Sequence, residues 1–152
     1  MSWHRDEYDA LGVPFNKRGR ILDEDLEIWA QVWAKSPASF HGEFFDFTDV
    51  YVDPKPFTPK GPAMWFGGES LTEPVLRRLV QYGSGYHPLG RPKPEDVALL
   101  RAGLEAAGRS IDEIEMVGGT RVEFPDATST ASLATALEGI PEQMSMGFTT
   151  FC

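Results

Sequence analysis

The sequence predicts an α/β protein with parallel strands, and three observations support this prediction. Amphipathic helical patterns alternate along the chain with short apolar runs typical of buried strands. The apolar run at 63–66 ends in two glycines and passes directly into a helix start. Further strand–helix units of similar length follow at once, without a sequence repeat beyond this alternation.

Composition and charge limit the classes of function that the chain can have. The chain has 152 residues with a hydrophobic fraction of 41%, enough for one compact domain over 1–152 with a real core. Its formal net charge of -9, without a basic stripe, argues against a nucleic-acid partner. The sequence contains no run of about 18 apolar residues, so no membrane span is predicted. One cysteine fits a reducing, cytoplasmic environment.

The first part of the chain predicts helices and then an extended region. Helices are expected over about 5–11 and 21–34. A stripe of apolar residues on the second helix predicts packing against a sheet, and it consists of Leu22, Leu26, Trp29 and Trp33. Over 39–62, aromatic and β-branched residues followed by four prolines predict a short β excursion and an extended connector.

The second part predicts successive strand–helix units. The strand at 63–66 is followed by a helix that starts near Thr72 or Glu73, with Pro74 in its first turn, and stops at Gly83. The remaining expected elements are strands near 85–89, 115–124 and 147–151, and helices over 94–107 and 128–137. Because the chain finishes inside an apolar β run, we expect it to be a fragment of a longer fold.

Gly67 and Gly68 form a candidate anion site. Without side chains, their backbone amides can approach an anion closely, and the following helix directs its positive dipole end to the same place. A tight turn that merely needs glycine is the alternative. On the anion-site hypothesis, Gly67→Asp should abolish binding and leave the fold largely intact. Arg91 and Lys93 could add phosphate contacts, or could be ordinary solvated charges before a helix.

Four segments in order and register carry a family resemblance: WHRDEYDALGVPFNKRGRILDE, FHGEFFDF, DPKPFTPKGPAMWFGGES and YGSGYHPLGRP. Together they resemble the luciferase-like monooxygenase superfamily, and most closely its branch that uses the deazaflavin coenzyme F420. The resemblance covers nearly the whole chain, from Trp3 to Phe151. It implies a partial (β/α)8 TIM barrel, from about the end of strand 4, at Ser2–Trp3, through strand 8.

The resemblance also implies an activity. Members are flavin- or deazaflavin-dependent oxidoreductases or monooxygenases, which carry out two-electron hydride transfer or oxygenation of a small organic substrate. Coenzyme F420 is the expected cofactor and FMN the alternative, and a homo-oligomer is possible. The expected residues fall into two groups. His4 is a candidate catalytic acid or base; the cofactor-binding candidates are Gly67, Gly68, Ser70, Tyr86, His87, Gly90 and Arg91.

Other functions and roles are also compatible with parts of the sequence. His87 could simply be hydrogen-bonded to neighbouring backbone. No HExxH pair or cysteine cluster indicates a metal site, and no GxSxG elbow indicates a nucleophilic hydrolase. The main alternative is a non-catalytic truncated remnant, or a cofactor-binding half-barrel that needs another chain.

Overall fold

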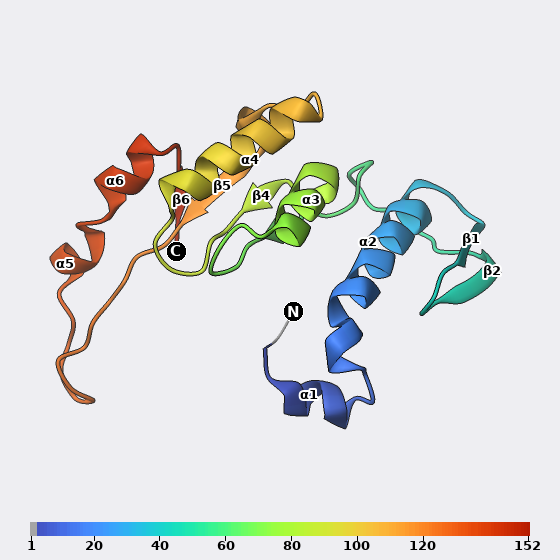
Figure 1. Ribbon diagram of the computed structural model, residues 1–152, viewed down its shortest axis with the longest axis horizontal. Helices are drawn as coiled ribbons and strands as arrows, with labels where there is room; N and C mark the ends of the chain where they lie inside the picture. Colours follow the sequence, from blue (N-terminus) through green and yellow to red (C-terminus); the bar gives the residue numbers. More distant parts are fainter. Residues whose placement is uncertain (1–2) are drawn as a thin grey trace. The chain divides into compact units, whose positions relative to one another are not determined.

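The computed structural model describes residues 3–152, which form two compact units. The first unit ends at Pro62 and the second spans Ala63–Cys152. Figure 1 labels the elements of both. Within the described residues, no helix is long and apolar enough to cross a membrane.

The first unit consists of helices followed by a two-stranded antiparallel hairpin. Its elements are α1 (Arg5–Ala10), the short 3-10 helix η1 (Phe15–Lys17), α2 (Arg18–Ala34), β1 (Ala38–His41) and β2 (Asp46–Val50). The expected helices and β excursion are confirmed, although α2 begins three residues earlier than predicted.

The apolar stripe of α2 is only partly buried. Leu26 is 1% exposed, whereas Trp29 is 40% exposed and stacks on Trp33 with ring centroids 6.0 Å apart. The second buried residue of the helix is Val32, which lies outside the predicted stripe. Trp29 therefore lies outside the buried core of this unit, whereas Trp33 is half-buried and its ring lies against Gly61.

Hydrogen bonds that involve charged side chains fix the position of the hairpin against α2. The Glu24 carboxylate on α2 accepts hydrogen bonds from the amides of Glu43, Phe44 and Phe45, at 2.7, 2.9 and 3.2 Å, in the turn between β1 and β2. After β2, the Lys55 ammonium donates to carbonyls at the carboxyl end of α2, which satisfies acceptors that the helix leaves unpaired.

The second unit is built on a parallel sheet with strand order β3-β4-β5-β6. The strands are β3 (Trp65–Phe66), β4 (Gly85–Tyr86), β5 (Glu115–Gly118) and β6 (Thr150–Phe151). The intervening helices are α3 (Glu73–Tyr82), α4 (Pro94–Ala106), the 3-10 helix η2 (Ile111–Glu113), α5 (Leu133–Leu137) and α6 (Ile140–Ser145). Strand–helix alternation and parallel pairing confirm the predicted α/β class.

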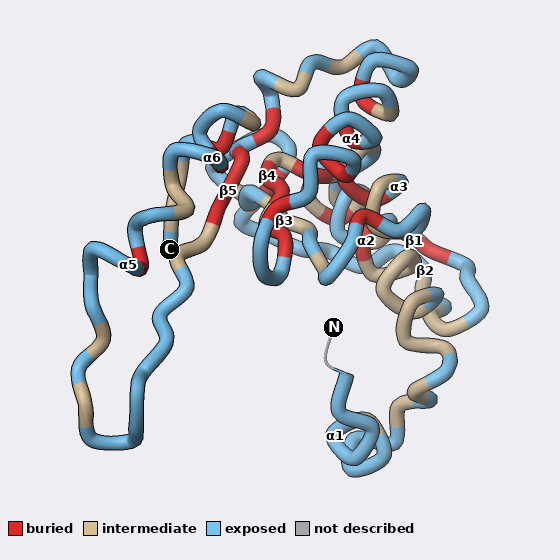
Figure 2. Tube along the Cα trace, turned by 60° about the vertical axis from the view of Figure 1, so that its left-hand side comes forward, coloured by how far each residue is buried: buried red, intermediate tan, exposed pale blue. Residues whose placement is uncertain are grey.

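The hydrophobic core lies where α3 and α4 cover one face of this sheet (Figures 1 and 2). It contains Leu71, Leu79, Tyr86, Val97, Leu100, Leu104, Ile114, Met116 and Phe148. Because neighbouring strand residues point to opposite faces, the residues that alternate with Tyr86 and Met116 lie on the other face. We call this other side the second face.

The region after β5 differs from the prediction. The strand stops at Gly118 rather than near 124, α5 is shorter than expected, and α6 was not foreseen. Consecutive glycines and Pro125 weaken strand formation here. The Asp126 carboxylate then closes a turn by accepting from the amides of Thr128 and Ser129, each at 2.8 Å.

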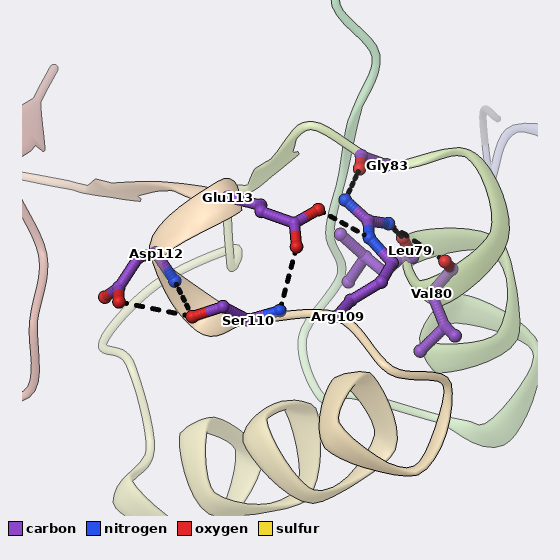
Figure 3. Close-up of polar contacts among 7 residues, drawn as sticks. All are labelled: Leu79, Val80, Gly83, Arg109, Ser110, Asp112 and Glu113. Atoms are coloured by element: carbon purple, nitrogen blue, oxygen red, sulfur yellow. Dashed lines mark hydrogen bonds and ion pairs between the residues drawn. The ribbon is translucent and has the colours of Figure 1, made fainter.

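Arg109 organises the edge at which the strands begin. Its guanidinium donates to the carbonyls of Leu79, Val80 and Gly83 at the end of α3, and its Nε lies 3.0 Å from Glu113 (Figure 3). A cation at a helix carboxyl end satisfies unpaired carbonyls and complements the helix dipole. This network fixes the turn that leads from α3 into β4.

Candidate functional site

The carboxyl ends of the four parallel strands meet at one edge of the sheet, which we call the strand-end edge. Hydrogen bonds continue past the strands: the His87 amide donates to Phe66 O at 3.0 Å, and the Leu89 amide to Gly68 O at 2.9 Å. On the far pair, the Cys152 amide donates to Gly118 O at 3.3 Å. The loop residues at this edge are therefore held in register with one another.

Gly67 is required by a close approach between two of these loops. A β-carbon on Gly67 would collide with the backbone carbonyl oxygen of His87, whereas one on Gly68 would meet only Ser70 O, at 3.5 Å. The expectation that Gly67→Asp would leave the fold largely intact is therefore wrong, since any side chain there displaces backbone. Gly68 is the position at which charge can be added without a clash.

The loop Gly67–Ser70 offers unpaired amides at the strand-end edge. Within residues 3–152, none of these four amides donates to a protein acceptor. The next amides are used: Leu71 N donates to the buried Asp96 carboxylate at 3.2 Å, and Thr72 N donates to Ser70 O at 3.0 Å. The chain then enters α3, so backbone donors and a positive helix end lie in the same loop.

Cationic side chains stand on the two neighbouring loops. Gly90 has a φ of 94°, and Arg91 beside it is exposed. From the loop after β5, Arg121 reaches the same turn, because a β-carbon on Gly90 would lie 2.9 Å from its guanidinium nitrogen. Sequence reasoning missed Arg121, since the strand was expected to continue through it; its position just after the glycine pair 118–119 is the signal that could have found it.

Trp65, His87 and Cys152 gather on the second face at the strand-end edge. The rings of Trp65 and His87 are edge-to-face with centroids 6.4 Å apart, and Cys152 Sγ lies 3.4 Å from His87 Nε2. The Trp65 ring occupies the space in which a Gly85 side chain would lie. Sequence reasoning did not select Trp65 or Cys152, although the alternation of residues along each strand places both on this face.

Tyr86 points into the core rather than to this edge. Its side chain is 1% exposed and its ring lies 6.4 Å from that of Phe148. Within the described residues, its hydroxyl has no hydrogen-bond partner. Burial, reinforced by the Asp96 carboxylate, raises the pKa of Tyr86 to about 12. Its expected role in cofactor binding stays a prediction, and its observed contacts are those of a packing residue.

Ser70 and His4, the remaining candidate residues, are both exposed. Ser70 is exposed on the loop of unpaired amides. His4 belongs to the first compact unit, where it is the exposed N-cap of α1 and its ring lies 5.4 Å from that of Trp3. Its catalytic role stays a prediction. Ser2, which was assigned to the end of strand 4, lies outside the described residues.

A cavity in the second unit lies at the opposite edge, where the strands begin. It has a volume of about 500 Å³, and its lining includes Asp112, Glu113 and Glu115. These carboxylates already have partners in Ser110, Arg109 and Thr150, respectively. Among residues 3–152, no three histidine, cysteine or acidic side chains form a group that could hold a metal ion. The unpaired donors therefore favour the strand-end edge as the site.

Comparison with known proteins identifies the family. Residues 1–145 match the family model described as luciferase-like monooxygenase. An uncharacterized protein of Mycobacterium tuberculosis is 32% identical over 107 residues, which is 69% of this chain and 36% of that protein. The FMNH(2)-dependent dimethylsulfone monooxygenase of Pseudomonas putida is 32% identical over 71 residues, 45% of this chain and 20% of that enzyme.

A solved structure supports the same assignment at the level of fold. The coenzyme F420-dependent tetrahydromethanopterin reductase of Methanopyrus kandleri superposes with a TM-score of 0.67 at 14% identity, over 97% of this chain and 65% of that one. The chain thus spans about a third or less of the two curated relatives. The chain belongs to the luciferase-like monooxygenase family.

Proposed function

We propose that this chain binds the phosphate of a flavin-type cofactor in an oxidoreductase or monooxygenase that acts on a small organic substrate. The observation that carries the proposal is the run of four amides in Gly67–Ser70 that have no protein acceptor among residues 3–152, at the carboxyl end of a parallel strand and before a helix. In (β/α)8 barrels, of which we propose that this chain forms part, the loops after the late strands are the usual phosphate sites.

The residues at this edge fit such a cofactor. Backbone donors bind phosphate oxygens without the cost of ordering a side chain, and Arg91 or Arg121 can add charge-assisted hydrogen bonds. Trp65 and His87, on the second face, offer an aromatic surface for a planar ring. When bound, the cofactor supplies two-electron transfer; the chain's residues hold it at this edge.

Coenzyme F420 is the proposed cofactor and FMN the alternative. Both carry a planar ring system and a phosphate, so the loop Gly67–Ser70 does not distinguish the two cofactors. The relatives' names include both, since one is an F420-dependent reductase and another an FMNH(2)-dependent monooxygenase. The choice is therefore made by titration: F420 is expected to bind in the micromolar range, and micromolar binding of FMN without F420 overturns this preference.

A pair of matched variants tests whether the loop Gly67–Ser70 binds the cofactor phosphate. Gly68→Asp adds a carboxylate among the unpaired amides without a steric clash, so we expect at least about a tenfold loss of cofactor affinity, or about 1.4 kcal/mol. Ala102→Asp is the control. It adds the same charge at an exposed position on α4, and affinity should be unchanged. Unchanged affinity in Gly68→Asp assigns the loop to turn formation alone.

A further inference from the structure

The thiol of Cys152 and the imidazole of His87 form a pair contributed by two different strands. Cys152 follows β6 and His87 follows β4, and the S–N distance of 3.4 Å is a contact distance for sulfur. The sulfur also lies 3.7 Å from the Gly118 carbonyl oxygen. The Trp65 ring packs edge-to-face with the imidazole, so His87 is held by this packing as well as by its contact with the sulfur.

Access and composition decide which chemistry the pair can perform. Cys152 is exposed and is the single cysteine of the sequence, so it has no thiol partner within the chain. No third metal-binding side chain joins the pair among the described residues. A sulfur nucleophile beside a proton acceptor, open to solvent, suits a small electrophile that can reach it.

We propose that Cys152 and His87 form a peroxide-reactive site in which a hydroperoxide oxidises the thiol to a sulfenic acid. The imidazole Nε2 accepts the thiol proton as the sulfur attacks the terminal peroxide oxygen. An S–O bond forms, the O–O bond breaks, and the leaving oxygen takes the proton from the imidazole. Sulfur loses two electrons, the peroxide gains two, and the products are a sulfenic acid and an alcohol, or water from hydrogen peroxide.

The pair suits a hydroperoxide because the reaction needs one proton moved from sulfur to the leaving oxygen. A histidine in contact with the thiol can both accept and return that proton. The same edge carries the proposed cofactor loop, but the peroxide reaction involves only side chains of this chain. Failure of cofactor binding therefore leaves this inference standing, and the two can be tested separately.

The test follows sulfenic acid formation at Cys152 under hydrogen peroxide, trapped with dimedone and quantified by mass spectrometry. At neutral pH, the native chain should react about tenfold faster than the same chain unfolded in guanidinium. His87→Gln should lose that advantage. His41→Gln is the matched control, because His41 pairs with Asp46 in the first unit, and it should react like the unaltered chain.

Alkylation separates proton transfer from access. At about pH 10 an ordinary cysteine thiol is ionised without help, so its rate with iodoacetamide reports access alone. His87→Gln should react as fast as the unaltered chain in that assay. The proposal is overturned if native and unfolded chains react equally with peroxide, or if His87→Gln slows both reactions by the same factor.

Discussion

The two edges of the parallel sheet in the second unit use their polar groups in opposite ways. Where the strands begin, Arg109 and Glu113 form their hydrogen bonds within the chain, and the Glu115 carboxylate accepts a hydrogen bond from the Thr150 hydroxyl. Where the strands end, the amides of Gly67–Ser70 have no protein acceptor within residues 3–152. A cavity lies at the first edge, yet three of its carboxylates are already paired. We therefore place the proposed site by unpaired donors rather than by cavity volume.

Gly67 and Gly68 give the largest expected contrast at the strand-end edge. Gly67→Ala should lower the free energy of unfolding by about 3 kcal/mol, because its β-carbon collides with the His87 carbonyl. Gly68→Ala should change it by less than about 1 kcal/mol. Urea unfolding followed by circular dichroism measures both. Equal midpoints for the two variants would mean that the β3 and β4 loops do not approach as described.

Arg109 tests the opposite edge. Arg109→Met should lower the free energy of unfolding by about 2 kcal/mol, since two carbonyls of α3, the Gly83 carbonyl and the Glu113 carboxylate lose a charged partner. The matched control is Arg101→Met, an exposed position on α4, with a change within about 0.5 kcal/mol. Cofactor affinity of the folded protein should be unaffected by either. A large loss of affinity in Arg109→Met would break the functional distinction between the edges.

Tyr86 tests the division between the two faces of the sheet. Tyr86→Phe removes a buried hydroxyl that lacks a partner in the part of the chain that the structure describes, and it should raise the free energy of unfolding by about 1 kcal/mol. The pKa of this tyrosine is about 12 in the folded chain and about 10 when unfolded. Stability should therefore fall as pH rises from about 10 to 12, and the phenylalanine variant should lack this fall.

Exposed Tyr51 provides the control for that experiment. Tyr51→Phe, at a side chain 72% exposed, should leave both the stability and its alkaline dependence unchanged. If Tyr86→Phe instead destabilises the protein, the hydroxyl has a partner, and the side chain belongs to the site rather than to the core.

Asp126, in the loop after β5, gives the smallest effect. Hydrogen bonds from Ser129 and Thr128 hold the pKa of Asp126 well below its ordinary value. A lowered pKa means that its contribution to local order is complete above about pH 4 and is lost as pH falls through the folded pKa. Amide exchange at Thr128 and Ser129 should rise only in that acid range. Asp126→Asn should lose the pH dependence; identical profiles would contradict the turn.

The strand–turn–helix at 63–83 could be predicted because its signals are local. The apolar run, the glycine pair and Pro74 each act within a few residues of the structure they specify. The contact of Cys152 with His87 could not, because it depends on the register of β6 against β5 and of β5 against β4. Trp65 likewise needs Gly85 opposite it, a pairing that no single segment reveals. The prediction that this strand continues to about residue 124 placed Arg121 within a strand rather than in the loop after β5.

Gln143 on α6 closes the base of the excursion between β5 and α6. Its side-chain amide accepts from Gly119 N at 3.1 Å and donates to Gly119 O at 2.9 Å and Gly139 O at 3.3 Å, in the manner of one residue of a neighbouring strand. The two ends of the excursion are thereby tied together by a single buried side chain. Insertions or deletions between them can accumulate in evolution without shifting the strand register that aligns the site.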